Sequence, residues 1–143
     1  MASREAIGNG EQQGFTTGAT RSAAANKIDY EGHISPRVQA IFGEYMNQHR
    51  IQRDGQLRSS DNWQLGIPIP NYVKSFIRHS TEFWQMWRGY SVVNQDSGNA
   101  FTFMDVLCAL RFNIDGMILE LDRCGRLHQH VIETDTRRDM EQS

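Results

Sequence analysis

A chain of 143 residues with a formal net charge of −2 is long enough for one domain and carries no large basic field. This charge argues against duplex nucleic acid as the main partner. There is no apolar run of about 18 residues and no basic-then-apolar leader, so we expect no membrane partner and a cytoplasmic protein. Cys108 and Cys124 fall in and just after one helical pattern, which fits a reducing compartment better than a disulfide framework.

The two ends of the chain differ in composition from its middle. Residues 1–26 are rich in Gly, Ala, Ser, Thr and Gln, and such a segment buries too little apolar surface to order itself. We therefore expect 1–26 to be a flexible N-terminal arm and the polar residues 126–143 to be a tail. The working domain is predicted over 27–125.

The first long helix is predicted to begin at Ser35 and Pro36, a capping hydroxyl followed by proline at the first helical position. Apolar residues then recur with helical spacing as far as about Arg50. These residues are Val38, Ile41, Phe42, Tyr45 and Met46. Residues 51–66 are polar and predict a loop that turns at Asp54–Gly55, and the prolines of Ile67–Pro70 predict an extended segment.

A second helix is predicted from about Asn71, a suitable cap, to Arg88, and Gly89 can end it. A third is predicted over Phe101–Arg123. Because no β-type alternation of useful length occurs, the sequence predicts an all-α fold, a compact helical bundle of three to four main helices. Three long helices make a thin core, so we expect a homo-oligomer.

Polar groups interrupt the apolar sides of the second and third predicted helices. The second carries His79 and Glu82 at i, i+3 spacing. The residues that share one side of the third are Asp105, Ala109, Asn113, Gly116 and Glu120. Carboxylates and an amide in a groove can hold a divalent cation and, through it, phosphates. An interface-facing or solvated stripe, with His79 as an ordinary core histidine, explains the same pattern, and both interpretations stay open.

One residue of this stripe has a specific steric implication. A glycine in mid-helix costs about 1 kcal/mol relative to alanine. Gly116 is therefore expected to allow another helix or a ligand to come close.

Short motifs follow one another in a definite order over Gly18–Arg123. They are Gly18-Ala19-Thr20-Arg21, Lys27-Ile28-Asp29-Tyr30-Glu31, Ser35-Pro36, Phe42-Gly43-Glu44-Tyr45, Asp61-Asn62-Trp63-Gln64-Leu65-Gly66-Ile67-Pro68, Arg78-His79, Trp87-Arg88-Gly89-Tyr90, Asp105-Val106-Leu107-Cys108-Ala109 and Phe112-Asn113. The order resembles the dATP/dGTP diphosphohydrolase family found widely in phages, a small relative of the MazG-like all-α NTP pyrophosphohydrolases. The resemblance covers most of the chain.

This resemblance implies hydrolysis of a purine deoxynucleoside triphosphate to the monophosphate and pyrophosphate, in the host cytoplasm if the chain is phage-encoded. It implies Mg²⁺ (or Mn²⁺) as cofactor, with Glu44, His79 and Asp105 as the polar groups around the metal and phosphates. Glu82 is the candidate for helping to orient the attacking water or a second ion, and His79 is the other candidate catalytic residue.

The resemblance also implies residues that bind the substrate. Arg21 and Lys27 would neutralise the triphosphate, and Asn113 would be a supporting amide. Either Trp63 or Tyr30 could stack on the purine, or each could pack against the bundle.

The acidic pairs of MazG-like enzymes, Glu-x-x-Glu and Glu-x-x-Asp, are absent from this chain. Asn47 stands three residues after Glu44, and Gln85 stands three residues after Glu82. This difference motivates a second hypothesis, in which the chain is a non-catalytic nucleotide-binding or scaffolding helical module.

Overall fold

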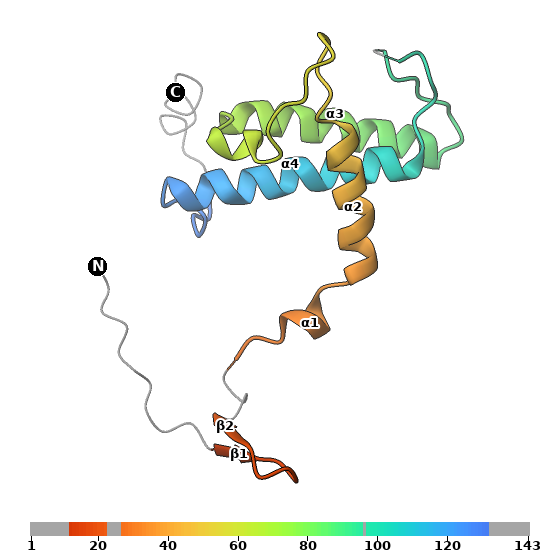
Figure 1. Cartoon of the computed structure of the whole chain (residues 1–143). Helices are drawn as coiled ribbons and strands as arrows, with labels where there is room; N and C mark the ends of the chain where they lie inside the picture. The colour runs from red at the N-terminus through yellow and green to blue at the C-terminus, as the bar shows by residue number, and fades with distance from the viewer. Residues whose placement is uncertain (1–11, 23–26, 96, 132–143) are drawn as a thin grey trace. The chain divides into compact units, whose positions relative to one another are not determined.

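The computed structural model describes residues 12–22, 27–95 and 97–131 of the chain, and it is mostly helical (Figure 1). Its elements are β1 (Gln12–Gly14), β2 (Thr20–Ser22), α1 (Tyr30–His33), α2 (Pro36–Gln48), a 3₁₀ helix (Asn62–Leu65), α3 (Ile69–Trp87) and α4 (Phe103–Arg123). The prediction of a helical fold with three long helices is confirmed. Among these described helices none is long and apolar enough to cross a membrane.

The chain divides into two compact units between Gln39 and Ala40, and each is described by itself. In the first unit β1 and β2 pair antiparallel, with Gln12 opposite Ser22. Gly18, with a φ of 86°, lies in the connecting turn. The sequence predicted only a flexible arm here, because strands of three residues are too short to show an alternating pattern. The rest of the predicted arm, and the predicted tail beyond residue 131, lie outside the described residues.

The start of α2 is the one that the sequence predicted. The Val38 amide N–H donates to the Ser35 hydroxyl over 3.3 Å, so the serine caps the helix that Pro36 begins. In the second unit, Tyr45 near the end of α2 is buried against Cys108 and Ala109 of α4. This contact fixes the end of α2 on α4.

The boundaries of α3 and α4 differ by two residues from those predicted. α3 begins at Ile69 rather than Asn71, so Ile69 and Pro70 are helical and not extended. Proline is tolerated there because the first amide groups of a helix have no partner within it. α4 begins at Phe103, because Thr102 caps it through a reciprocal capping box with Asp105.

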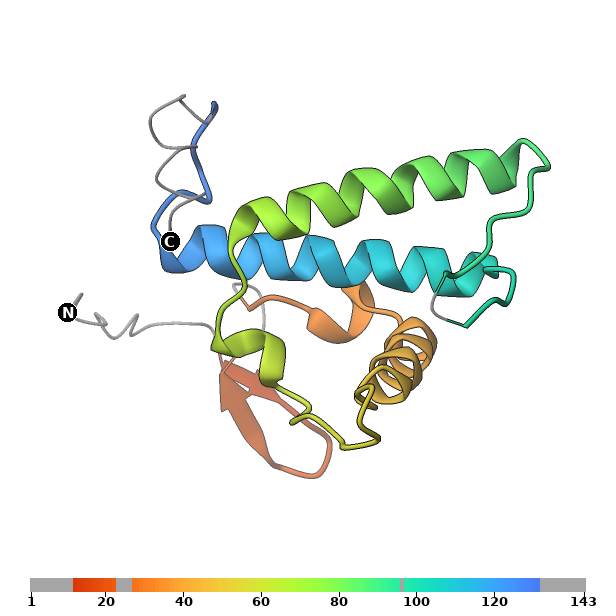
Figure 2. The same ribbon diagram turned by 90° about the horizontal axis from the view of Figure 1, so that it is seen from above.

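α3 and α4 lie side by side and run antiparallel, as both views show (Figures 1 and 2). Tyr72 of α3, which is 2% exposed, lies with its ring against Gly116, where a Cβ atom would overlap it. The expectation that Gly116 answers a steric need is confirmed, and the close neighbour is a helix. The Tyr72 ring also meets Phe112 edge to face, with 5.8 Å between ring centroids.

Gly116→Ala is expected to lower the free energy of unfolding by about 1–3 kcal/mol, because the added methyl group forces Tyr72 out of its place. Urea denaturation followed by far-UV circular dichroism measures the change. Gly43→Ala is the matched control, since nothing lies within 4 Å of its added Cβ, and we expect it to stabilise α2 by up to about 1 kcal/mol. Equal destabilisation of the two variants would contradict the packing argument.

Candidate functional site

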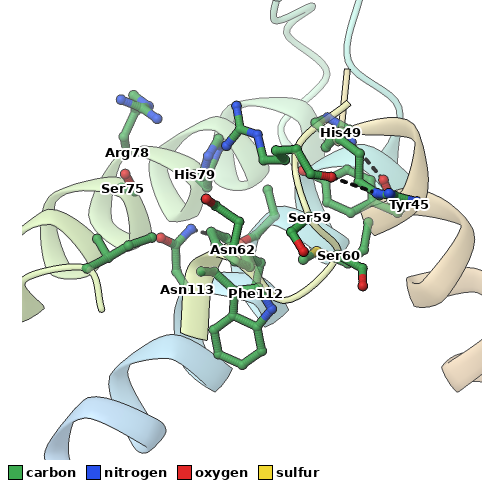
Figure 3. Close-up of a pocket in the computed structure, with 16 residues that line it drawn as sticks. Tyr45, His49, Ser59, Ser60, Asn62, Ser75, Arg78, His79, Phe112 and Asn113 are labelled. Atoms are coloured by element: carbon green, nitrogen blue, oxygen red, sulfur yellow. Dashed lines mark hydrogen bonds between the residues drawn. The ribbon is translucent and has the colours of Figure 1, made fainter. Parts of the chain in front are cut away.

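A cavity of about 340 Å³ lies between the end of α2, the loop that follows it, α3 and α4 (Figure 3). The charged and amide side chains that line it include His49, Arg50, Arg58, Arg78, His79 and Asn113. No aspartate or glutamate is among the described residues of its lining. The volume is in the range of pockets that hold small molecules, about 300–1,000 Å³. The cavity is therefore cationic and of ligand size.

The arginines of this cavity have little compensating negative charge. Within the described part of the chain, the Arg58 side chain makes no ion pair or hydrogen bond. Arg50 donates only to neutral acceptors, the Arg58 carbonyl oxygen at 3.0 Å and the Asn47 side-chain oxygen at 3.4 Å. Arg78 lies 4.0 Å from Glu82, a distance at the limit of an ion pair. Guanidinium groups gathered in this way favour an anionic ligand.

A hairpin-shaped loop brings Arg58 back to the end of α2. The Arg58 amide N–H donates to the Arg50 carbonyl oxygen over 2.9 Å, and the Arg50 Nε donates in return over 3.0 Å. The turn between them contains Asp54 and Gly55, and Gly55 has a φ of 79°. The Asp54–Gly55 turn was predicted from the sequence, but Arg50, Arg58 and His49 were not predicted as site residues. Arg50 and Arg58 stand on either side of Asp54–Gly55, and this position in the sequence was the available sign that the turn brings them together.

His79 and Glu82 form a pair one turn apart on α3. Nδ1 of His79 lies 2.7 Å from Oε2 of Glu82, and the two side chains are only 14% and 15% exposed. Because a carboxylate accepts, Nδ1 carries the hydrogen, and in the neutral imidazole Nε2 is then the proton acceptor. His79 also borders a neighbouring hollow of about 700 Å³ that Glu82, Val92 and Phe101 help to line. The pair thus lies at the boundary of two hollows.

A second imidazole, that of His49, is held by the end of α2. Its Nδ1 donates to the Tyr45 carbonyl oxygen over 2.8 Å, and its ring lies over the Tyr45 ring with centroids 4.0 Å apart. Burial raises the pKa of Tyr45 to about 12, with smaller contributions from Cys108 and Asp105. Tyr45 therefore stays neutral and supports His49 without adding charge to the cavity.

Aromatic rings form another part of the wall. Trp63 of the 3₁₀ helix meets Phe112 edge to face, with 6.1 Å between centroids. The 3₁₀ helix is tied to the end of α4, because Arg123 donates to the Gln64 carbonyl oxygen over 2.7 Å. Arg123 also pairs with Glu120 over 3.0 Å, so this carboxylate of the predicted stripe serves to hold the wall.

Of the residues predicted to act on substrate, three line the cavity. They are Trp63, His79 and Asn113, and Glu82 lines the adjoining hollow. Asn113 is 3% exposed and its amide donates to the Ala109 carbonyl oxygen over 2.8 Å. Arg21, Lys27 and Tyr30 belong to the N-terminal unit, where their side chains are exposed.

The predicted metal ligands are not gathered in one place. Glu44 is exposed, and Asp105 accepts hydrogen bonds from the Thr102 amide and hydroxyl at 2.9 and 2.8 Å as the cap of α4. Among residues 12–22, 27–95 and 97–131, no three histidine, cysteine or acidic side chains are grouped to hold a metal ion. These donors therefore do not fit a metal ion bound by the protein alone.

No protein-family model, curated protein or solved structure matches this chain.

The raised pKa of Tyr45 gives an alkaline prediction. The folded chain holds this proton more tightly than the unfolded chain, whose tyrosines titrate near 10.0, so the stability from Tyr45 is complete below pH 10 and is lost as the pH rises towards about 12. Urea denaturation across this range is expected to show a shallower loss in Tyr45→Phe than in wild type. Tyr90→Phe, at a side chain that is mostly exposed, should follow the wild-type profile. Identical profiles for wild type and Tyr45→Phe would contradict the assignment.

Proposed function

We propose that this chain hydrolyses purine deoxynucleoside triphosphates, dATP or dGTP, to the monophosphate and pyrophosphate. One observation carries the proposal: a ligand-sized cavity gathers three guanidinium groups and two imidazoles, with no carboxylate among its described lining residues. A polyphosphate is the metabolite group whose charge density matches such a cluster. The order of motifs in the sequence supports the same substrate class.

The arginines are proposed to bind the phosphates and the rings to bind the base. Arg50 and Arg58 lie together on the hairpin loop, where their two planar guanidinium groups can bind successive phosphate groups. Trp63 lines the same cavity and presents an aromatic surface for stacking on a purine. Asn113 supplies an amide on the α4 side.

His79 is proposed as the general base. Its Nε2 takes a proton from a water whose oxygen attacks the α-phosphorus, while the bond from that phosphorus to the bridging oxygen breaks and pyrophosphate leaves with the electron pair. Glu82 fixes the tautomer and balances the imidazolium that forms, as its 2.7 Å contact with Nδ1 allows. Arg78 and its neighbours stabilise the negative charge on the phosphoryl oxygens.

The divalent ion is proposed to arrive as part of the substrate. Nucleoside triphosphates bind Mg²⁺ or Mn²⁺ through their own phosphate oxygens. A metal–nucleotide complex needs no cluster of protein ligands, which agrees with the separate positions of Glu44, His79 and Asp105 in the fold.

A nucleotide panel with Mg²⁺ or Mn²⁺, followed by pyrophosphate release, tests this function. Turnover is expected for dATP or dGTP, and Arg58→Ala should lower kcat/KM by about 10- to 100-fold, since a hydrogen bond to a charged group contributes about 1.5–3 kcal/mol. Arg53→Ala is the matched control, because Arg53 is on the same loop but does not line the cavity. A folded protein that releases no pyrophosphate from any purine triphosphate would overturn the proposal.

The same panel separates catalysis from binding alone. His79→Gln should lower kcat by about 10²- to 10⁴-fold while nucleotide affinity by calorimetry changes little. If wild type instead binds nucleotides without turnover, the chain is a nucleotide-binding module. The scattered acids are the observation that favours this second function.

A further inference from the structure

α3 carries two neighbouring rows of side chains with the alternating three- and four-residue spacing of helix-packing seams. The first row faces α4 and consists of Tyr72, Phe76, His79, Phe83 and Met86. The second row is shifted by one residue and consists of Val73, Ile77, Ser80, Trp84 and Trp87. Trp84 and Trp87 in this second row are 63% and 72% exposed. α3 therefore has a second apolar row that lacks a neighbour among the described residues of the second unit.

α4 repeats this arrangement. Its first row consists of Val106, Ala109, Asn113, Gly116 and Glu120, and all of these but Glu120 are buried. Its second row, again shifted by one residue, consists of Phe103, Leu107, Leu110, Ile114, Met117 and Leu121. Phe103, Leu107 and Ile114 are each at least two-fifths exposed. Both α3 and α4 thus have a second row of apolar side chains that is largely exposed.

The two second rows point to the same side of the helix pair. One residue turns an α-helix by about 100°. Since α3 and α4 run antiparallel, the same one-residue shift turns them in opposite senses when both are viewed from one end (Figures 1 and 2). The first rows of α3 and α4 face each other, and the one-residue shift rotates the two second rows in opposite senses. Both second rows therefore point to the same side of the helix pair. We call this face, made by the second rows of α3 and α4, the bare face.

The opposite side of the helix pair is covered. Cys108 and Phe112 precede Ala109 and Asn113 by one residue, so they point away from the bare face. Tyr45 of α2 packs on Cys108, and Trp63 of the 3₁₀ helix packs on Phe112. The cavity lies on this covered side.

We propose that a second copy of this chain packs on the bare face about a two-fold axis perpendicular to the helices. Such an axis reverses the direction of every helix. Because α3 and α4 are antiparallel, the reversed pair again contains one helix in each direction, so the two copies can pack through the same face. The face is also bulky at one end, with Trp84, Trp87 and Phe103, and slimmer at the other, with Val73. The axis places the bulky end of each copy on the slim end of its partner, and the product is a four-helix bundle.

The exposed area agrees with a dimer interface. The large side chains of the bare face are on average about half exposed and together offer on the order of 600 Å² of apolar surface. A stable interface buries about 800 Å² per partner, and the rim of such an interface supplies the remainder. Apolar area of this size on one face is at the upper end for a soluble monomer.

Light scattering coupled to size exclusion tests the proposal on the full chain. Wild type is expected at about twice the chain mass of 16.4 kDa, with a thermal midpoint that rises with protein concentration. Ile77→Glu and Trp84→Glu each place a charge on the bare face and should give helical monomers. Leu65→Glu is the matched control, since Leu65 is 85% exposed on the 3₁₀ helix outside the bare face, and it should remain a dimer.

Circular dichroism of each variant shows whether its helices are retained, and the concentration dependence of the wild-type midpoint gives a readout that needs no variant. A wild type at the mass of one chain with a concentration-independent midpoint would overturn the proposal. So would helical Ile77→Glu and Trp84→Glu chains that both keep the dimer mass.

Discussion

The close approach of α3 and α4 at Tyr72 and Gly116 is the constraint on which the second unit depends. A ring that occupies the space of a missing side chain sets how near the two helices lie. That spacing places His79 of α3 and Asn113 of α4 on one cavity. Phe112, held edge to face by Tyr72, in turn supports Trp63. The packing core and the cavity wall are therefore continuous, and a change in helix spacing alters both.

Charge, more than shape, distinguishes the cavity from an ordinary gap between helices. The acidic side chains nearby are engaged elsewhere: Glu82 with His79, Glu120 with Arg123, and Asp105 with the cap of α4. None of these three carboxylates is bonded to Arg50 or Arg58. An anionic ligand that binds these two guanidinium groups would therefore stabilise the folded chain by mass action.

The sequence predicted features that depend on neighbours along the chain. The Ser35 cap, the extents of the long helices within two residues, and the His79–Glu82 pair all arise from spacings of a few residues. The cationic loop was not predicted, because Arg50 and Arg58 meet only when the hairpin closes and only their position on either side of Asp54–Gly55 indicated it. Asp105 was predicted as a metal ligand, but in the structure its carboxylate accepts hydrogen bonds from Thr102 in the capping box of α4.

Because a hairpin loop holds Arg50 and Arg58, the number of residues in that loop affects which ligand the cavity binds. One main-chain hydrogen bond and one from the Arg50 side chain join Arg50 and Arg58, so the register of a few backbone groups decides which side chain lines the cavity. Inserting or deleting a single residue at the turn would move Arg58 out of register with Arg50, although the chain would still contain both arginines. Homologous or redesigned chains with a different number of residues here would select ligands of different charge.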